Sequence, residues 1–481
     1  MEARFRSLPR IVVAGTSGDS GKTLAALGLI LLARERAIPV VAFKKGPDYI
    51  DTAWLSWASG GPARNLDSFL MGWESAAWSF FTRAEPAGLS VIEGNRGMYD
   101  GVDAQGTHST AELAKQLRAP VLLVVNATKA TRTVAALVLG CQKLDPEVRI
   151  GGVILNQFGG RRHERLLRGA VEETCGVPVV GAVPRANREV LLPSRHLGLV
   201  TPDEHPDVER VRGNVLALFN DRLDLARILE IARSAPPFVP PRALSETSED
   251  GHGLRIGYLK DSAFTFYYPE NLEAIEKSGA SLVPFSALLG TSASDDVDAL
   301  YIGGGFPETH GSQISQNQPF LESIRSHIAN GLPVYAECGG LMLLARAINW
   351  RGRRYPMARV FPVEVEVCGT PQGHGYSQLM VDRLNPFFPP GTRLRGHEFH
   401  YSRIMGDPGL FLTACKVERG TGCGTGRDGM IVNNCWASYT HLHALATPAW
   451  IKGLIAAARR FKSAKPLVFL PQDTGQSALA S

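Results

Sequence analysis

Residues 11–23 read IVVAGTSGDSGKT, and this stretch decides the fold of the first half of the chain. Its apolar start predicts a buried strand, and the glycine-rich turn behind it is typical of a phosphate-binding loop. In such a loop, backbone N–H groups at the start of a helix bind phosphate oxygens. Lys22 is expected to reach the outer phosphates, and the Thr23 hydroxyl to coordinate Mg²⁺. We therefore predict an ATP site formed by Gly18, Asp19, Gly21, Lys22 and Thr23.

The spacing of this loop departs from the usual pattern. Thr16 stands where the first glycine is normally found, and Gly15 lies one residue earlier. Residues 24–33 form an apolar run with helical periodicity directly behind the loop. Because a strand precedes the loop and a helix follows it, the context supports phosphate binding more strongly than a purely structural turn.

The same alternation of apolar runs and helical stretches continues to about residue 235, which predicts a parallel sheet with helices on both faces. We expect strands at residues 11–14, 40–43, 90–92, 120–125, 152–155 and 179–182. Residues 236–241 are rich in proline and residues 245–251 are polar, so this region is expected to be a linker.

The strand and helix pattern then restarts and predicts a second α/β domain. Strands are expected at residues 254–258, 281–284 and 299–302, and a helix at 270–277. We therefore divide the chain into an ATP-binding domain at 1–235, a linker at 236–253, a second domain at 254–463 and a flexible tail at 464–481.

Composition limits the classes of partner. The 481 residues carry a net charge of only +5, and no dense Lys/Arg block with interleaved aromatic residues occurs, so nucleic-acid binding is not expected. No apolar run approaches the length of a membrane span, and the short run behind the basic N-terminus does not resemble a signal peptide. Seven scattered cysteines do not suggest a disulfide framework. We expect a reduced, cytoplasmic protein.

Charged residues follow the second and third expected strands of the first domain. Residues 44–51 read KKGPDYID, and residues 93–101 read EGNRGMYDG. The carboxyl ends of strands in an open α/β sheet present ligand-binding loops. Asp48 and Glu93 are therefore candidate Mg²⁺ ligands, and Lys44 is a candidate for neutralising transferring phosphoryl oxygens.

In the second domain, a glycine-rich loop and a cysteine each follow an apolar strand. Residues 303–308 read GGGFPE, and Gly304 and Gly305 are candidate contributors to an oxyanion hole. Cys338 lies in AECGG, and a helix starting at Gly339 would lower the pKa of its thiol. His441 is the candidate base for that thiol. Together they predict a cysteine nucleophile with a histidine base.

Two histidine clusters are candidate metal sites. GHEFH at residues 396–400 has one residue too few between its histidines to match the zinc-protease helix. His441 and His443 are two residues apart, but no matching pair of ligands lies near them in the sequence. A structural zinc site is therefore not expected.

With these motifs in place, the chain resembles the cobyrinic acid a,c-diamide synthase family, which are ATP- and glutamine-dependent tetrapyrrole amidases. The resemblance extends from the phosphate-binding loop to about residue 463. Its motifs are GTSGDSGKT, KGPDYID, STAELA at 109–114, FTFYYPENL at 264–272, GGGFPE, AECGG, GHEFHYS and SYTHLH. The first half is similar to dethiobiotin synthetase, which has the same shifted loop, and the second half is similar to the triad class of glutamine amidotransferases.

The resemblance implies a phosphate-binding parallel-sheet domain followed by a class I glutamine amidotransferase domain. It implies that a peripheral carboxylate attacks the γ-phosphate of ATP, that Cys338 and His441 release ammonia from glutamine, and that ammonia displaces phosphate. This would be repeated at the a- and c-carboxylates of cobyrinic acid in cobalamin biosynthesis. Lys22, Thr23, Asp48 and Glu93 would serve nucleotide and Mg²⁺, with Lys44 near the transferring group. Tyr49, Asp51 and Asp100 would lie toward the macrocycle, and Asn156 would read the base.

The chain departs from the family pattern at three places. Asn126 stands where an aspartate is common, Asn95 and Arg96 replace a more apolar pair, and His443 occupies the position where full triads carry a glutamate. The added arginine could meet a carboxylate of a different macrocycle. Because His443 replaces the glutamate of full triads, the sequence does not identify the group that orients His441.

The sequence leaves several alternatives open. The same chemistry could act on sirohaem, hydrogenobyrinic acid or a nickel-sirohydrochlorin. In a different class, the chain would be a regulatory ATPase with an inert amidotransferase-like module, although an inert module has no need of both Cys338 and His441. The order of amidation, the path of ammonia between the domains and whether the chain forms a homodimer also stay open.

Overall fold

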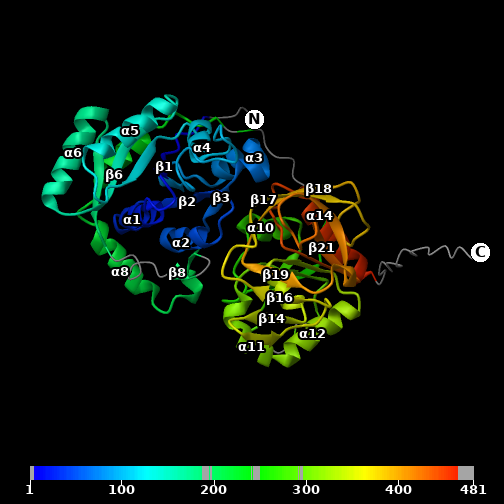
Figure 1. Ribbon diagram of the computed structural model, residues 1–481. Coiled ribbons are helices and arrows are strands. Elements are labelled where there is room, and N and C mark those ends of the chain that lie inside the picture. Colours follow the sequence, from blue (N-terminus) through cyan, green and yellow to red (C-terminus); the bar gives the residue numbers. More distant parts are fainter. Residues whose placement is uncertain are drawn as a thin grey trace, which may run out of the picture. The chain divides into compact units, whose positions relative to one another are not determined.

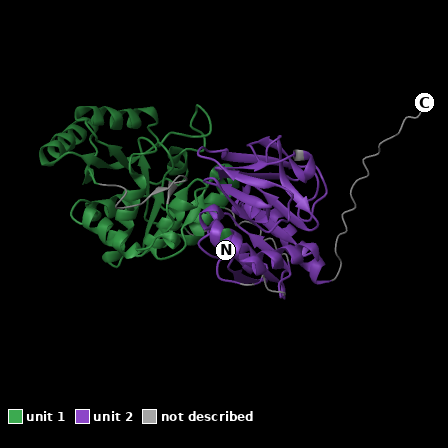
Figure 2. Cartoon of the chain, turned by 60° about the horizontal axis from the view of Figure 1, so that its bottom comes forward, with its two compact units in different colours: residues 1–246, 268–270 green, residues 247–267, 271–481 purple. Residues whose placement is uncertain are grey.

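The computed structural model describes residues 5–186, 194–195, 198–239, 241, 250–290, 292 and 296–463. Two compact units divide the chain (Figure 2). Unit 1 comprises Met1–Glu246 with Tyr268–Glu270, and unit 2 comprises Thr247–Tyr267 with Asn271–Ser481. The boundary at Glu246 falls inside the segment expected to be the linker, 236–253. Residues 240 and 242–249 of that segment lie outside the described residues. The expected flexible tail at 464–481 also lies outside them.

Unit 1 alternates strands with helices along the chain (Figure 1). Its strands are β1 (Arg10–Gly15), β2 (Val40–Lys45), β3 (Arg64–Leu66), β4 (Leu89–Glu93), β5 (Val121–Asn126), β6 (Ile150–Phe158), β7 (Val179–Pro184), β8 (Ser194–Arg195) and β9 (Gly198–Leu199). Its helices are α1 (Lys22–Glu35), α2 (Ile50–Ser59), α3 (Ser68–Arg83), α4 (Thr110–Gln116), α5 (Arg132–Leu144), α6 (Arg161–Cys175), α8 (Val208–Phe219) and α9 (Leu225–Arg233), with a 3₁₀ turn at Pro202–Glu204.

Within the described residues, seven strands of unit 1 form one sheet in the order β3-β2-β4-β1-β5-β6-β7, and every pairing in it is parallel. The central strands β4, β1 and β5 are mostly apolar and almost fully buried because helices cover both faces, as the sequence predicted. One core joins the sheet to α3, α4, α5 and α6, while α1 contacts β1 and β4 from the other face (Figure 1). This arrangement places the carboxyl ends of β1, β2 and β4 side by side.

Unit 2 begins with a parallel α/β segment and continues with strands. Its strands are β10 (Arg255–Leu259), β11 (Ser281–Phe285), β12 (Ala299–Ile302), β13 (Val334–Glu337), β14 (Ala347–Trp350), β15 (Arg353–Pro356), β16 (Glu364–Val367), β17 (Gly373–Val381), β18 (Arg393–His400), β19 (Ser402–Met405), β20 (Leu412–Arg419), β21 (Arg427–Val432), β22 (Cys435–Ser438) and β23 (His441–Leu442). Its helices are α10 (Pro269–Lys277), α11 (Gly311–Gln316), α12 (Gln318–Ala329), α13 (Gly339–Leu344) and α14 (Pro448–Lys462), with 3₁₀ turns at Pro307–His310 and Pro408–Leu410.

In the described part of unit 2, the main sheet has the order β11-β10-β12-β13-β22-β21-β20-β17-β18-β23. The pairings from β11 to β22 are parallel, and those from β22 to β23 are antiparallel. A second sheet contains β15, β14, β16 and β19. Because β12, β13 and β22 are parallel neighbours, their carboxyl ends meet at one edge of the main sheet.

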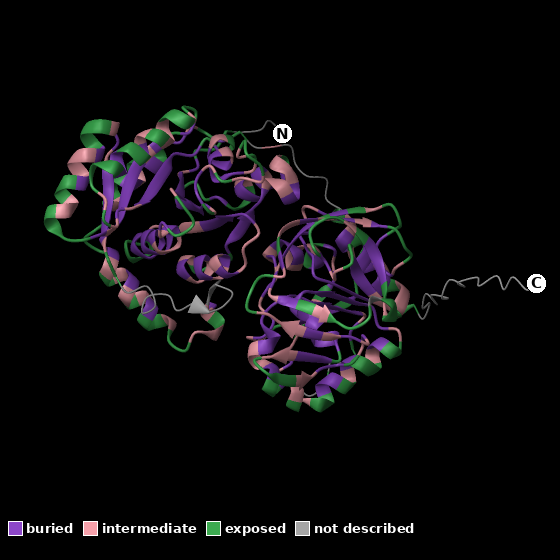
Figure 3. Cartoon of the chain, viewed as in Figure 1, coloured by how far each residue is buried: buried purple, intermediate pink, exposed green. Residues whose placement is uncertain are grey.

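Burial follows the sheets in each unit. Figure 3 shows the strands at the centre of each unit buried and the outward-facing turns of the helices exposed. The described helices include none that is both long enough and apolar enough to cross a membrane. The candidate functional side chains described next lie at the carboxyl ends of strands in these two buried sheets.

Candidate functional site

The phosphate-binding loop connects β1 to α1, which begins at Lys22. Gly21 precedes the helix with φ of 95°, a left-handed conformation that favours glycine. A side chain on Gly21 would overlap the amide of Asn156, which extends from β6. That amide donates from Nδ2 to the carbonyl oxygen of Ser20 over 2.8 Å. Loop and asparagine therefore form one preorganised surface.

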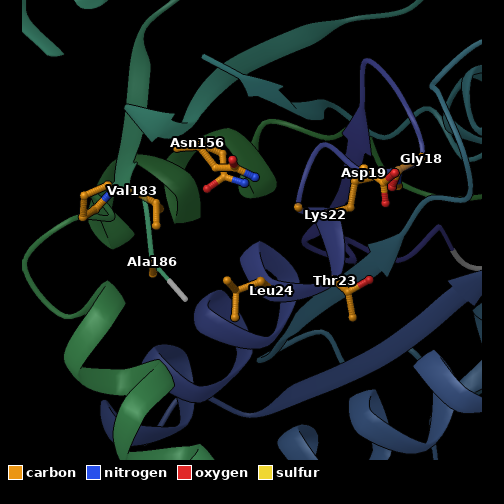
Figure 4. A pocket seen from close by; sticks show the side chains of 11 residues that line it. Gly18, Asp19, Lys22, Thr23, Leu24, Asn156, Val183 and Ala186 are labelled. Carbon is orange, nitrogen blue, oxygen red and sulfur yellow. The ribbon is translucent and has the colours of Figure 1, made fainter. Parts of the chain in front are cut away.

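A cavity opens at this loop, and Figure 4 shows the side chains around it. Its lining includes every loop residue expected to bind nucleotide, together with the asparagine: Gly18, Asp19, Gly21, Lys22, Thr23 and Asn156. Gln157 and Val183 line the same cavity. The structure therefore brings these six residues together around a space that opens at the N-terminus of α1.

Lys22 lies across the loop. Its Nζ donates to the carbonyl oxygens of Ser17 at 2.9 Å and Gly18 at 3.2 Å. Burial lowers the pKa of Lys22 to about 8, and the positive charge of Lys44 adds to the effect. A bound phosphate would act in the opposite direction, because a negative charge favours the protonated amine.

A buried cluster of charges lies at the carboxyl ends of β2 and β4, where Lys44 and Glu93 are paired in register. Lys44 Nζ lies 2.6 Å from Asp51 Oδ2 and 2.9 Å from Glu93 Oε1. The hydroxyl of Thr23 donates to the same Glu93 oxygen over 2.6 Å. Burial acts to lower the pKa of Lys44, but the carboxylates of Asp51 and Glu93 outweigh it and raise that pKa. Lys44 is therefore a permanent positive charge at the site.

The oxygen atoms of this cluster fit a magnesium ion, which prefers oxygen ligands. Oε2 of Glu93 is buried and has no hydrogen-bond partner in the described part of the chain. Burial raises the pKa of Glu93 and that of Asp48, and the charge of Asp51 raises both further, against the opposing effect of Lys44. A divalent cation would lower both pKa values and satisfy the unpaired oxygen. Thr23, Asp48 and Glu93 therefore form a chemically suitable donor set.

The three residues expected near the macrocycle, Tyr49, Asp51 and Asp100, differ in exposure: the first two are half-buried and Asp100 is exposed. Tyr49 begins α2 and packs against Tyr268 of the same unit, with ring centroids 4.6 Å apart. Asp51 is held by Lys44, as described above. Asp100 is exposed and its Oδ2 accepts the N–H of Gly97 over 2.8 Å, so it shapes its own loop. Asn126, the departure noted at the end of β5, accepts the N–H of Thr128.

In unit 2, Cys338 sits at a sharp turn between β13 and α13. Its φ is 47° and its ψ is −98°, a strained conformation for a non-glycine residue. Its N–H donates to the carbonyl oxygen of Ser438 over 2.7 Å, which extends the pairing of β13 with β22. A strand, a strained turn and a helix start present a nucleophile at the end of a sheet.

The glycine-rich loop after β12 lies against this turn. A side chain on Gly339 would come within 2.9 Å of the backbone nitrogen of Gly305, so the two backbones are in close contact. A side chain on Gly304 would come within 2.6 Å of Cε1 of His441. The loop therefore contacts both the cysteine turn and the imidazole, and the N–H of Gly305 is placed to serve an oxyanion next to Cys338.

The prediction that the helix start lowers the pKa of Cys338 is wrong. Burial raises the pKa of the Cys338 thiol far above its usual range, and the negative charge of Glu308 adds to this. The N–H of Gly339 acts in the expected direction but is outweighed. Cys338 is only 5% exposed, and sequence alone could not reveal that burial. The resting thiol is neutral and must give up its proton to a base.

His441 reaches the same edge of the sheet from β23. Its ring stacks on His397 of β18, with centroids 5.0 Å apart and planes inclined by 20°. Burial lowers the pKa of His397 well below its usual range, so that ring is neutral. On its other side, Nδ1 of His441 lies 3.4 Å from Oε2 of Glu337. The structure thus brings Cys338, His441, Gly304 and Gly305 together.

Sequence reasoning missed Glu337. Full triads carry the acid two residues after the histidine, but this chain has His443 at that position. Nδ1 of His443 accepts the N–H of Leu445. Glu337 instead directly precedes the nucleophile, and only the pairing of β13 with β22 brings it to the histidine. The available signal was a glutamate closing an otherwise apolar strand. Among the described residues, no group of three or more His, Cys, Asp or Glu side chains is arranged to hold a metal.

Comparison with known protein families matches both units. Residues 11–200 match the CobQ/CobB/MinD/ParA nucleotide binding domain. Residues 255–449 match the CobB/CobQ-like glutamine amidotransferase domain. The first match contains the phosphate-binding loop and the charge cluster, and the second contains Cys338 and His441.

Curated relatives match nearly the whole chain. The cobyrinate a,c-diamide synthase of Magnetococcus marinus is 41% identical over 450 residues, which is 92% of this chain and 96% of the relative. That of Syntrophotalea carbinolica is 39% identical and covers 94% of this chain and 99% of the relative. That of Archaeoglobus fulgidus is 38% identical and covers 95% of this chain and 98% of the relative.

Proposed function

The chain belongs to the cobyrinate a,c-diamide synthase family, and from this premise we propose that it amidates the a- and c-carboxylates of cobyrinate in cobalamin biosynthesis. Glutamine, or free ammonia, supplies the nitrogen and ATP activates each carboxylate. Unit 1 performs the activation and unit 2 releases ammonia. A cytoplasmic location accords with seven free cysteines, since reduced thiols are typical of that compartment.

In unit 2, the Cys338 thiol passes its proton to His441, and Sγ attacks the side-chain amide carbon of glutamine. The oxygen of the resulting tetrahedral intermediate is stabilised by the N–H of Gly305. The C–N bond then breaks, and His441 returns the proton to the leaving nitrogen, which departs as ammonia. Water hydrolyses the remaining thioester, releasing glutamate and restoring the thiol.

In unit 1, a carboxylate oxygen of the tetrapyrrole attacks the γ-phosphorus of ATP, and ADP leaves. Lys22 and Lys44 stabilise the negative charge on the transferring phosphoryl oxygens. Ammonia then attacks the acyl carbon of the acyl phosphate, and phosphate leaves. Each amide formed therefore consumes one ATP and one glutamine or ammonia, and the cycle repeats at the second carboxylate.

A magnesium ion would be held by Thr23, Asp48 and Glu93, where it would screen the charge of the outer phosphates. The protein contributes the preorganised loop, which binds phosphate oxygens through backbone N–H groups. Asn156 lines the same cavity and is the residue we assign to the adenine base. Tyr49, Asp51 and Asp100 stay assigned to the macrocycle side.

The observation that carries the proposal is the presence of both candidate half-sites in a chain that matches several cobyrinate a,c-diamide synthases over more than nine-tenths of its length. The family match favours cobyrinate over sirohaem, hydrogenobyrinate or nickel-sirohydrochlorin. The presence of both a thiol and an imidazole at one sheet edge speaks against an inert amidotransferase module attached to a regulatory ATPase.

Incubation of the purified protein with ATP, Mg²⁺, glutamine and cobyrinate tests this function directly. Mass spectrometry should show conversion of two carboxylic acids to amides, with one ADP formed per amide. Parallel reactions contain sirohaem, hydrogenobyrinate or nickel-sirohydrochlorin. Preferential amidation of one of these over cobyrinate would refute the proposed substrate, and absence of amidation in every reaction would refute the activity.

A further inference from the structure

The carboxylate of Glu337 is the buried acid nearest the proposed base of unit 2. Oε2 lies 3.4 Å from Nδ1 of His441, and Oε1 accepts the N–H of Leu442 over 3.0 Å. Glu337 has no exposed surface. One carboxylate therefore contacts both the imidazole of His441 and the backbone of the next residue.

A hydrogen-bond network fixes this carboxylate and the segment that follows His441. The Tyr301 hydroxyl donates to Oε2 of Glu337 over 3.2 Å. Asn271 donates from Nδ2 to Tyr301 at 3.1 Å and to the carbonyl oxygen of Leu442 at 2.9 Å. Its Oδ1 accepts the N–H of Ala444 over 2.7 Å. The network thus holds the acid and the histidine segment in one geometry.

The charges around Glu337 single out His441. Burial raises the pKa values of Tyr267, Tyr301 and Tyr335, so these neighbours are neutral. Among the described residues, His441 is the basic side chain within 4.0 Å of the carboxylate of Glu337. A buried carboxylate with neutral neighbours is best compensated when this histidine becomes positively charged.

We propose that Glu337 is the positioning residue of His441 and replaces the acid that other triads carry two residues after the histidine. This inference rests on the proposed function of unit 2. Oε2 of Glu337 accepts a hydrogen bond from the N–H at Nδ1, which fixes the tautomer with a basic Nε2. Nε2 then receives the thiol proton of Cys338, and the carboxylate stabilises the imidazolium that forms. The stacked ring of His397 restrains the plane of the imidazole.

The variant Glu337→Gln tests this role, because it keeps the size of the side chain and an oxygen for the N–H of Leu442. An amide facing Nδ1 favours the wrong tautomer, so kcat for glutamine hydrolysis should fall by about 10²-fold or more. KM for glutamine should change little, since Glu337 is buried beneath the site. The acid limb of the kcat/KM profile should move to lower pH, because the variant removes a negative charge next to the proposed base.

Two further variants separate positioning from a merely structural role. Glu337→Asp retains the charge and should recover at least about tenfold of the lost kcat. Tyr301→Phe removes one hydrogen bond from the same oxygen and should cost only a few-fold, in line with about 1 kcal/mol. A rate within threefold of the parent for Glu337→Gln would overturn the proposal. So would a loss with an unchanged pH profile and no recovery in Glu337→Asp.

Ammonia-dependent amidation of cobyrinate, measured on the same preparations, separates this inference from the proposed function. It should be equal in the parent and Glu337→Gln, because unit 1 is unaltered. Its absence from the parent refutes the function and leaves glutamine hydrolysis to decide the role of Glu337. If Glu337→Gln does not fold, Tyr301→Phe decides: a kcat for glutamine hydrolysis a few-fold below that of the parent, with KM unchanged, supports the role, and a parental kcat overturns it.

Discussion

At the scale of single residues, unit 2 places its nucleophile in a strained turn with a neutral, buried thiol. The conformation of Cys338 costs about 1–3 kcal/mol relative to an ordinary one. It is held by the pairing of β13 with β22 and by the close contact of Gly339 with the loop after β12. The strain is therefore localised at the atom proposed to attack glutamine.

Substitution Cys338→Ala should lower glutamine-dependent amidation by about 10⁴-fold or more, because the attacking atom is removed. Amidation driven by free ammonia should be unchanged, since only the nitrogen supply is lost. Both rates are measured by ADP release and by mass spectrometry of the product. Cys368→Ala, at a half-buried cysteine of the same unit, serves as the matched control. Loss of both activities together would contradict the division of labour between the units.

Substitution Gly304→Ala should displace the proposed base, because the added carbon would lie 2.6 Å from Cε1 of His441. A shift of this order costs about 10²-fold in rate. We expect that loss in kcat/KM for glutamine, with ammonia-dependent amidation retained. Gly369→Ala is the control, since nothing lies within 4 Å of its added carbon. Equal kinetics in the two variants would show that His441 is not held against this loop.

At the scale of elements, the parallel part of each unit follows from the sequence. All six strands expected in the first domain are present, as β1, β2, β4, β5, β6 and β7. They could be predicted because buried parallel strands are nearly continuous apolar runs. β3 was missed because its three residues, RNL, carry no apolar run. The expected strands of the second domain form as β10, β11 and β12, and the expected helix forms as α10.

The later strands of unit 2, from β14 to β21, were not predicted; their pairings are antiparallel except for that of β14 with β16. These strands alternate buried and exposed residues and contain many glycines, as in GHGYSQLMV of β17, so periodicity alone does not mark their bounds. The candidate site divides in the same way. The phosphate loop, Lys44, Glu93 and Cys338 are legible because each lies at the end of an apolar strand or directly after it. Glu337 was not, because its partner is 104 residues away in the sequence.

The packing of α1 on α8 provides a prediction about stability. A side chain on Gly28 would come within 2.5 Å of the ring of Phe219, so the two helices meet at a glycine. Gly28→Val should destabilise unit 1 by about 1–3 kcal/mol through overpacking. Denaturant unfolding followed by circular dichroism measures this. Gly140→Val on exposed α5, with open space around the added carbon, should change stability little. Equal stability of the two variants would contradict the packing argument.

At the scale of the whole molecule, two chemistries that need different surroundings occupy separate units. Unit 1 supplies fixed positive charge and oxygen ligands for phosphoryl transfer. Unit 2 supplies a buried thiol, a stacked pair of histidines and backbone N–H groups. Each half can therefore be disabled without touching the residues of the other.

Lys22→Ala should abolish amidation with either nitrogen donor, by about 10²-fold or more, because both require the activated carboxylate. Glutamine hydrolysis without ATP should persist at the parental rate. The two reactions are followed separately as ADP and glutamate release. Lys143→Ala, an exposed lysine on α5, should leave all rates unchanged. Retention of ammonia-dependent amidation in Lys22→Ala would remove this lysine from the proposed chemistry.

The raised pKa of Cys338 also governs how the enzyme survives between turnovers. Peroxide and alkylating agents react with thiolates rather than thiols, so a nucleophile that stays protonated and 5% exposed at rest resists both. Reactivity then depends on transfer of the proton to His441 when glutamine occupies the site. The burial that overturns the simple expectation for a helix start should therefore also slow oxidation of Cys338, which peroxide titration of the resting protein measures.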